Sequence, residues 1–355
     1  MSAPINWQAA ERRAASLARP GPRAGRAELD GLVRVLRQAA GQAPAHVASI
    51  TGLDDAAARA AQRPVYVVDR ARWAEANIAM FAHLTGGLLP EAKLPGAARL
   101  GGEELGIMLS FLSSKVLGQY DPFTPADAVP GQGVDDPAGR LLLVAPNVLH
   151  VERELDLDAL DFRTWVCLHE QTHAVQFAAA PWLADHLSSR MRSMITTVSE
   201  PESGAQRISS TLRAVVEALS TRDGATSLAG PLVDGFLSEA EREQLGEMVA
   251  VMSLLEGHAD VVMDAVGPRV LPSVTRIRRQ FEKRRDGTGL LDIMLRRLSG
   301  MDAKIAQYRD GAGFVRGVVD LVGHDGLNAV WTAAPLLPTA AEIADPARWV
   351  QRVHG

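Results

Sequence analysis

Residues 165–177 read Trp-Val-Cys-Leu-His-Glu-Gln-Thr-His-Ala-Val-Gln-Phe, an apolar run that contains the pattern H-E-x-x-H at His169, Glu170 and His173. On a helix, residues four apart lie above one another on one face, so both imidazoles can point at the same ion. The glutamate between them lies beside this pair, within reach of a water molecule on the ion. The stretch therefore predicts a helix that carries two metal ligands and a general base.

A third ligand is needed, because zinc in a catalytic site usually has three protein ligands and an open fourth position. The best candidate is Glu256, which lies in the stretch 247–264, where apolar residues recur at helical spacing. Glu256 and Asp260 are four apart and share a helix face, so one carboxylate can bind the metal while the other orients a histidine ligand. Gly257 would let another helix approach closely. His258 lies on a different face and is not a candidate ligand.

An H-E-x-x-H helix followed by a later helix with E-x-x-x-D resembles the pattern of the gluzincin metallopeptidases. The resemblance implies that His169, His173 and Glu256 bind Zn2+. It also implies that Glu170 is the general base and that Asp260 is the hydrogen-bond partner of a zinc-bound histidine. The fold that it implies is a zincin-like core.

Further motifs extend the resemblance over roughly residues 60 to 353. Tyr308-x-x-Gly311-x-x-Phe314-Val315 and the segment 338–346 look like the tails of small zincins. The contexts of residues 181–183 and 255–264 are similar to an actinobacterial family of zinc-dependent metallopeptidases or hydrolases associated with deazaflavin coenzyme biosynthesis. Within the resemblance, Tyr308 is the candidate that stabilises the oxyanion, and a structural hydrogen bond is its alternative role.

Composition narrows the class of protein. The chain has 355 residues, 47% of them hydrophobic and 22% charged, with a formal net charge of −5. These values are ordinary for a globular protein and do not favour nucleic-acid binding. No run of 18 apolar residues suggests a membrane span, and the N-terminus lacks the apolar segment of a signal peptide. Cys167 is the single cysteine, which excludes an internal disulfide and favours core packing and a cytoplasmic location.

Helical patterns outnumber strand patterns, which predicts a mainly α (α+β) fold with a small β-sheet and helical additions. We expect an N-terminal helical segment at residues 1–60 and a zincin-like catalytic region at 61–355. Helices are predicted near 26–37, 70–86 and 101–119, and strands near 64–69 and 140–145. In a gluzincin, the strand before the metal helix can form the cleft edge that pairs with an extended peptide. Residues 140–145 are either that edge or an internal strand.

The boundaries of the motif helix are also predicted. Asp161 can cap its N-terminus, and Pro181 should stop it. The long segment between His173 and Glu256 predicts a helical insertion around residues 183–240, which either packs against the core or closes over the site. The stretch 272–285 carries a run of basic residues, which is expected to be the solvated face of a helix rather than an anion or substrate site.

Two functions remain open at this stage. The first is a zinc-dependent metallohydrolase, a peptidase that cleaves peptide or amide bonds with a metal-activated water and Glu170 as base. The alternative is a catalytically silent, zinc-stabilised binding or regulatory protein on the same scaffold. An open fourth metal position would favour the enzyme. Neither the substrate nor the oligomeric state follows from the sequence.

Overall fold

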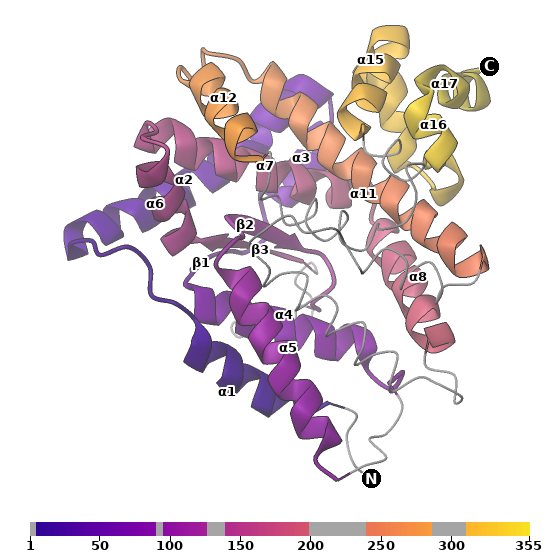
Figure 1. Ribbon diagram of the computed structural model, residues 1–355. Coiled ribbons are helices and arrows are strands. Elements are labelled where there is room, and N and C mark those ends of the chain that lie inside the picture. The colour runs from indigo at the N-terminus through magenta and orange to yellow at the C-terminus, as the bar shows by residue number, and fades with distance from the viewer. Residues whose placement is uncertain (1–4, 90–94, 126–138, 199–238, 286–309) are drawn as a thin grey trace.

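A computed structural model describes residues 5–89, 95–125, 139–198, 239–285 and 310–355 (Figure 1). In these ranges helices dominate, and the strands form one three-stranded sheet. This confirms the predicted mainly α fold with a small sheet. The division at residue 60 stays a prediction.

The sheet consists of β1 (Val65–Val68), β2 (Gly118–Asp121) and β3 (Arg140–Val144) in the order β1-β3-β2. Strand β3 runs parallel to β1, with Val65 opposite Leu141, and antiparallel to β2, with Gly118 opposite Leu143. Every residue of β3 is buried. A continuous apolar run is expected for a strand covered on both faces.

Helices surround this sheet. The chain before β3 forms α1 (Trp7–Leu17), α2 (Arg26–Thr51), α3 (Asp54–Ala60), α4 (Arg70–Thr85) and α5 (Ala97–Ser113). The chain after β3 forms α6 (Ala145–Glu154), α7 (Ala159–Ala179), α8 (Leu183–Val198), α11 (Glu239–Ala265), α12 (Val274–Arg285), α15 (Gly311–Leu327), α16 (Ala340–Ala344) and α17 (Pro346–His354), with the short 3-10 helices η2 (Asn328–Trp331) and η3 (Ala334–Leu336).

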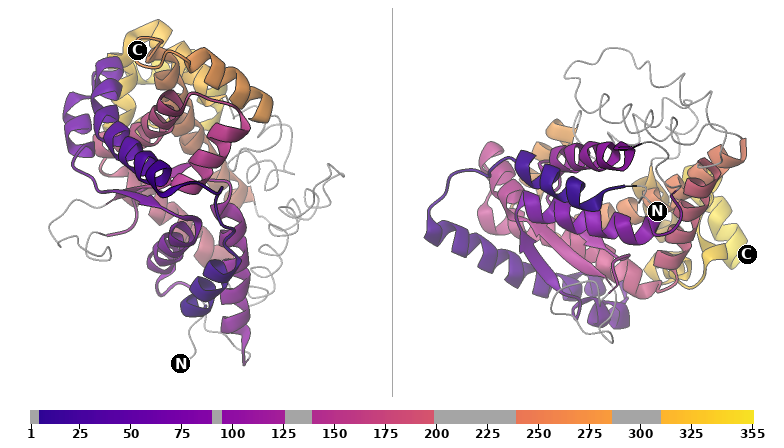
Figure 2. Two further views of the ribbon diagram at one scale, coloured as in Figure 1. Left: turned by 90° about the vertical axis from the view of Figure 1, so that its left-hand side faces the viewer. Right: turned by 90° about the horizontal axis from the view of Figure 1, so that it is seen from below.

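The two faces of β3 define two layers. Leu141 and Leu143 pack in one cluster with residues of α2, α6 and α7. Leu142 and Val144 pack in another cluster with residues of α1, α4 and α5. Successive side chains of a strand point to opposite faces, so the sheet lies between these two groups of helices. Figures 1 and 2 show the same order, with α1, α4 and α5 on one side of the sheet.

Helix α7 carries the H-E-x-x-H motif and is central to the packing. It lies along α2 and α3 and also contacts α11 and β2. Helix α11 in turn packs against α15. A Cβ atom added to Gly257 would overlap the backbone of Gly311 on α15, so the predicted close approach of another helix at Gly257 is confirmed.

Three sequence predictions need correction. The helix expected over 101–119 ends at Ser113, and residues 118–121 form β2 because they pair with β3. Since β2 covers one side of β3 and β1 the other, residues 140–145 are an internal strand and not a cleft edge. The N-cap of α7 is Asp158, whose carboxylate accepts from the backbone amides of Leu160 and Asp161. Asp161 lies in the first turn.

The other predicted elements are found where the structure describes them. Helix α12 accounts for the basic run, and α8 begins the predicted insertion. Leu183 and Leu187 of α8 pack with Ala250 and Leu254 of α11. The rest of the insertion, 199–238, lies outside the described residues. None of the helices in the described ranges is long and apolar enough to cross a membrane.

Candidate metal centre

Helices α7 and α11 bring three potential metal ligands together. The Nε2 atoms of His169 and His173 are 3.2 Å apart. Glu256 places Oε2 at 3.5 Å from the Nε2 of His169 and Oε1 at 3.6 Å from the Nε2 of His173. All three ligand atoms lie within 4.8 Å of one another. The structure thus assembles the ligand set that the sequence predicts.

The dimensions of this triangle can be compared with those of a zinc site. Zinc bonds to nitrogen or carboxylate oxygen are about 2.0–2.2 Å long, so neighbouring ligand atoms of a tetrahedral site lie roughly 3.3 Å apart. The 3.2 Å between the two histidine nitrogens agrees with that value, and each of these nitrogens has a different oxygen of Glu256 at 3.5 or 3.6 Å. Two imidazoles and one carboxylate also suit Zn2+ better than Mg2+ or Ca2+. The three ligands found among the described residues therefore fit a zinc ion.

Glu170 lies between this triangle and the sheet. Its side chain is buried and contacts β2 at Gly118, where an added Cβ would come within 2.5 Å of the Glu170 Cγ atom. Burial raises the pKa of Glu170 to about 7, with the charge of His169 opposing and that of Glu256 adding to the shift. A carboxylate with a pKa near neutrality is suited to accept and return a proton.

The pKa values of the two histidines are shifted in opposite directions. Burial alone would lower the pKa of His169, but the hydrogen bond and charge of Glu256 outweigh burial and raise it to about 9. For His173, burial lowers the pKa, and Glu256 does not overcome this effect. Two nitrogens 3.2 Å apart can share one proton between them. The raised pKa of His169 and the lowered pKa of His173 favour His169 as the charged member of the pair in the metal-free protein.

An aromatic wall flanks His169. Trp165, one turn earlier on α7, stacks on its imidazole with ring centroids 6.5 Å apart. The ring of Phe281 on α12 lies 4.7 Å from that of Trp165, and the ring of Phe162 lies 6.2 Å from Trp165 and 5.7 Å from Phe281. This wall limits the rotation of His169 and connects α12 to the metal centre.

The partner of His173 is a residue that sequence reasoning did not identify. Its Nδ1 atom lies 2.9 Å from the Oε1 of Gln176. Asp260 was expected to orient a ligand, and its charge acts on both histidines, where it raises their pKa values. Its Oδ1 atom also lies 3.9 Å from Arg278. The spacing His173-x-x-Gln176 on one helix face is the signal that could have identified Gln176.

Other predicted residues have simpler roles. Cys167 is completely buried, its thiol donates to the carbonyl of Leu36, and burial raises its pKa, as expected for a packing residue. His258 is also completely buried, and its ring packs on Trp331 with centroids 5.3 Å apart. Tyr308 lies outside the described residues, so its role stays a prediction.

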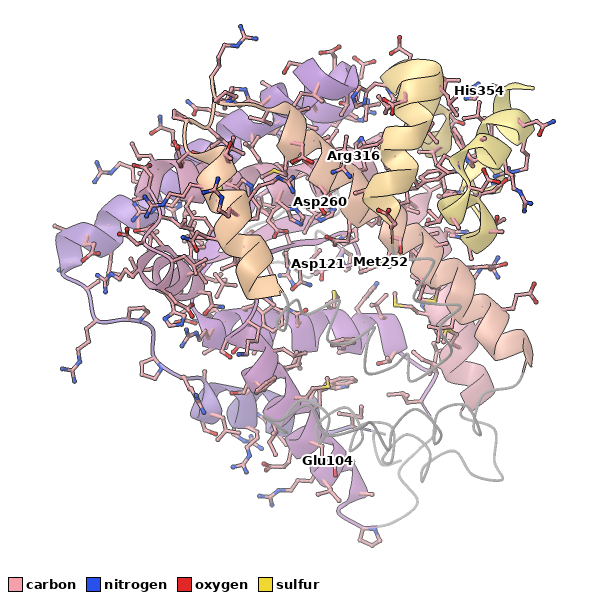
Figure 3. All side chains as sticks on the ribbon, turned by 45° about the horizontal axis from the view of Figure 1, so that its top comes forward. Glu104, Asp121, Met252, Asp260, Arg316 and His354 are labelled. Carbon is pink, nitrogen blue, oxygen red and sulfur yellow. The ribbon has the colours of Figure 1, made fainter. Side chains whose placement is uncertain are left out.

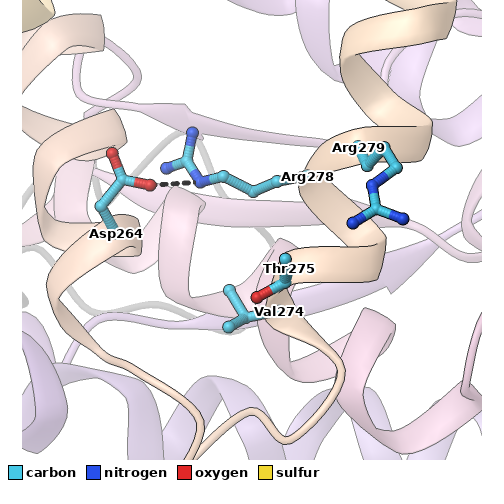
Figure 4. Close-up of a pocket in the computed structure, with 5 residues that line it drawn as sticks. All are labelled: Asp264, Val274, Thr275, Arg278 and Arg279. Carbon is cyan, nitrogen blue, oxygen red and sulfur yellow. Dashed lines mark ion pairs between the residues drawn. The ribbon is translucent and has the colours of Figure 1, made fainter.

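A cavity of about 320 Å3 lies between α11 and α12, away from the three ligands (Figure 4). It is lined by Asp264, Val274, Thr275, Arg278 and Arg279. Asp264 is about 12 Å beyond Glu256 along α11. The Asp264 carboxylate pairs with Arg278 at 2.5 Å (Figure 4) and with Arg316 of α15, which is labelled in Figure 3, at 2.8 Å, so it joins three helices. These contacts indicate a structural role.

Comparisons with known proteins agree with this site. A family model described as zincin-like metallopeptidase matches residues 5–350. A crystal structure from Chloroflexus aurantiacus, described as that of a proposed hydrolase with a novel fold, is similar to this chain with 29% sequence identity and a TM-score of 0.62. The similarity covers 98% of each chain. No curated protein matches the chain.

Proposed function

We propose, since the chain belongs to the zincin-like metallopeptidase family, that it is a zinc-dependent hydrolase that cleaves peptide or amide bonds. The observation that carries the proposal is the cluster of His169, His173 and Glu256, whose ligand atoms lie within 4.8 Å of one another, as the ligands of one zinc ion would. The similarity to a proposed hydrolase over 98% of both chains supports the same class of reaction.

The proposed chemistry divides between the ion and Glu170. When bound, Zn2+ supplies a Lewis acid that lowers the pKa of water to about 7 and polarises a carbonyl group. Glu170 takes the proton from the attacking water and then gives it to the leaving amine. Without the ion, burial raises the pKa of Glu170 to about 7, and a carboxylate in such a buried position is suited to exchange a proton near neutral pH.

Two further residues complete the proposed site. Asp260 supports the histidines through its negative charge, which favours their interaction with a cation. Tyr308 is the proposed donor to the oxyanion, on the basis of its place in the Y-x-x-G-x-x-F pattern. Replacement of Tyr308 with phenylalanine should lower kcat by about 100-fold while zinc stays bound. An unchanged kcat would exclude this role.

The test combines metal content with turnover. Zinc is measured by elemental analysis in the wild-type protein and in His173→Ala, and hydrolysis of a quenched fluorescent peptide library is measured for the wild type and Glu170→Gln. We expect about one zinc per chain in the wild type, little in His173→Ala, and full zinc without cleavage in Glu170→Gln.

Each other result has a clear meaning. Zinc without cleavage of any peptide by the wild type would favour the catalytically silent binding protein or an amide substrate outside the library. Cleavage that persists in zinc-loaded Glu170→Gln would remove Glu170 from the mechanism. The absence of zinc from the wild type would contradict the proposal. A cytoplasmic location and an association with deazaflavin coenzyme biosynthesis stay predictions.

A further inference from the structure

A chain of buried hydrogen bonds runs from His173 to helix α11. The Nδ1 of His173 lies 2.9 Å from the Oε1 of Gln176. The Nε2 of Gln176 lies 2.9 Å from the backbone carbonyl oxygen of Leu255 and 3.0 Å from the Nδ1 of His258. Gln176 and His258 both have no exposed surface. Water therefore does not compete for these bonds. The Nε2 of His258 has no hydrogen-bond partner among the described residues.

The carbonyl of Leu255 fixes the direction of every bond in this chain. A backbone carbonyl can only accept, so it requires the amide nitrogen of Gln176 on its side. The reverse orientation of the amide would place two oxygens about 3 Å apart, which is repulsive. One amide hydrogen then goes to Leu255 and the other to the Nδ1 of His258, which accepts. The amide oxygen is left facing His173 and can only accept.

This direction determines where His173 carries its proton. Because the Oε1 of Gln176 accepts, the Nδ1 of His173 must donate. A neutral imidazole has one N–H, so the Nε2 of His173 presents its lone pair toward His169 and Glu256. Metal binding through Nε2 requires this tautomer.

We propose that Gln176 and His258 are positioning residues that hold His173 as the Nδ1–H tautomer, with its Nε2 lone pair directed at the metal position. The role of this tautomer in metal binding rests on the proposed function, whereas the tautomer itself follows from the hydrogen bonds. Leu255 directly precedes Glu256, so one turn of α11 supplies both the third ligand and the carbonyl that fixes the tautomer of the second. The packing of α11 against α7 thus supplies both the Glu256 ligand and the Leu255 carbonyl.

The test uses a pair of matched substitutions on α7. Gln176→Met keeps the size of the side chain and removes its hydrogen bonds. Gln171→Met is the control, because Gln171 is also a buried glutamine of α7 but donates to the carbonyl of Ala40 on α2. His258→Phe removes the far acceptor and keeps an aromatic ring against Trp331.

Two properties are measured on the full-length chain. The first is the tautomer of His173 in the metal-free protein, from the ring 15N chemical shifts of histidine-labelled samples, with the His173 signal assigned by its loss in His173→Ala. The second is the affinity for Zn2+, from competition with a chromophoric chelator, together with the absorption spectrum of the Co2+ form. Neither property depends on turnover.

We expect His173 to carry its proton on Nδ1 in the wild type and Gln171→Met, and to become a mixture of tautomers in Gln176→Met. Zinc affinity should fall by about 10–100-fold in Gln176→Met, less in His258→Phe, and by under about twofold in Gln171→Met. The Co2+ spectrum should change in Gln176→Met.

A wild-type tautomer with the proton on Nε2, or a tautomer unchanged in folded Gln176→Met, would overturn the proposal. Equal zinc affinities of Gln176→Met and Gln171→Met would do the same. If Gln176→Met does not fold, the wild-type tautomer and the zinc affinity of His258→Phe decide instead, and an affinity of His258→Phe equal to that of Gln171→Met would overturn the proposal. If the wild-type chain binds no zinc, the proposed function fails, while the tautomer measurement still decides this inference.

Discussion

Gly118 and Glu170 are in direct contact across the boundary between β2 and α7. An added Cβ at Gly118 would lie 2.5 Å from the Cγ of Glu170 and 3.0 Å from its Oε1. Cβ atoms are not found this close to other heavy atoms, so the missing side chain at Gly118 provides the space that Glu170 occupies. The edge strand of the sheet thus determines the position of the proposed general base.

Replacement of Gly118 with alanine should therefore displace Glu170 and leave the ligands in place. A displacement near 1 Å in a catalytic group can lower the rate by on the order of 100-fold. We expect kcat to fall by that factor, with one zinc still bound per chain. Elemental analysis and hydrolysis of the best peptide found for the wild type would measure both effects.

Gly41→Ala is the control for this substitution. Gly41 lies within α2, and a Cβ atom added there would have no neighbour within 4 Å. Alanine in a helix is more stable than glycine by about 0.5–1 kcal/mol, so this variant should be slightly more stable and fully active. Full activity of Gly118→Ala would mean that Glu170 tolerates displacement or is not the base.

The contact between α11 and α15 gives a second prediction. Added Cβ atoms on Gly257 and Gly311 would both overlap backbone atoms of the facing helix. We expect Gly257→Ala to lower the free energy of unfolding by about 1–3 kcal/mol, as overpacking does, and to weaken zinc binding because Glu256 is adjacent. Urea denaturation and chelator competition would measure the two effects.

Gly246→Ala, on the same helix, is the matched control. No atom lies within 4 Å of a Cβ at Gly246. The gain in helix propensity should raise stability by up to about 1 kcal/mol without affecting zinc binding. If both variants gained stability equally, the close crossing of α11 and α15 would not exist in solution.

The metal ligands are the part of the site that could be predicted from the sequence. His169, Glu170 and His173 belong to one helix, and helical geometry alone determines their mutual placement. Glu256 was found because zinc chemistry demands a third ligand and a carboxylate occurred in a second helical pattern. The role of Gln176 depends on the Leu255 carbonyl of the docked helix α11, and backbone groups across a helix interface leave no pattern in the sequence.

The sheet was predicted less well, for a physical reason. Residues 140–144 form a continuous apolar run that identifies a buried strand but not its neighbours. Strand β2 has the sequence Gly-Gln-Tyr-Asp, which is short and has no strong strand propensity. It is a strand because β3 offers it hydrogen bonds. The edge strand next to Glu170 is therefore β2. Its assignment requires the pairing of β3 with a strand on each side, which the sequence does not show.

The start of α7 provides a third prediction. Asp158 accepts from the amides of Leu160 and Asp161, each at 3.0 Å, and so caps the helix. Asp158→Ala should lower the free energy of unfolding by about 1 kcal/mol, and Asp158→Asn should retain most of the stability. Chemical denaturation would separate these values. Equal losses for both variants would exclude a capping role.

Asp161 should act differently, because its carboxylate accepts from the amide of Ser273 at 2.6 Å. That bond fixes the start of α12, which carries Phe281 against Trp165. We expect Asp161→Ala to change the tryptophan fluorescence of the protein, because the surroundings of Trp165 change. Amide hydrogen exchange in α12 should increase. Exchange increased in α7 but not in α12 would contradict this role.

Zinc binding should release a proton from His169. Without metal, Glu256 raises the pKa of His169 to about 9, so the imidazole is protonated near neutral pH. A metal ligand must present a lone pair, so this proton has to leave. The release of this proton should thus increase the affinity for zinc about tenfold per pH unit below about pH 9, and less steeply above it. Isothermal titration calorimetry in buffers of different ionisation enthalpy counts the protons released.

Glu256→Gln separates His169 from other sources of protons. The amide lacks the negative charge that raises the pKa of His169, so the pKa of His169 should fall in the metal-free variant. Because Glu256 is also a proposed zinc ligand, this comparison is made on the metal-free proteins, by NMR titration of the His169 ring. We expect the pKa of His169 to be lower in Glu256→Gln than in the wild type. Equal pKa values would mean that Glu256 does not hold His169 in its charged form, and the two side chains would then lie further apart in solution than the 3.5 Å between their ligand atoms.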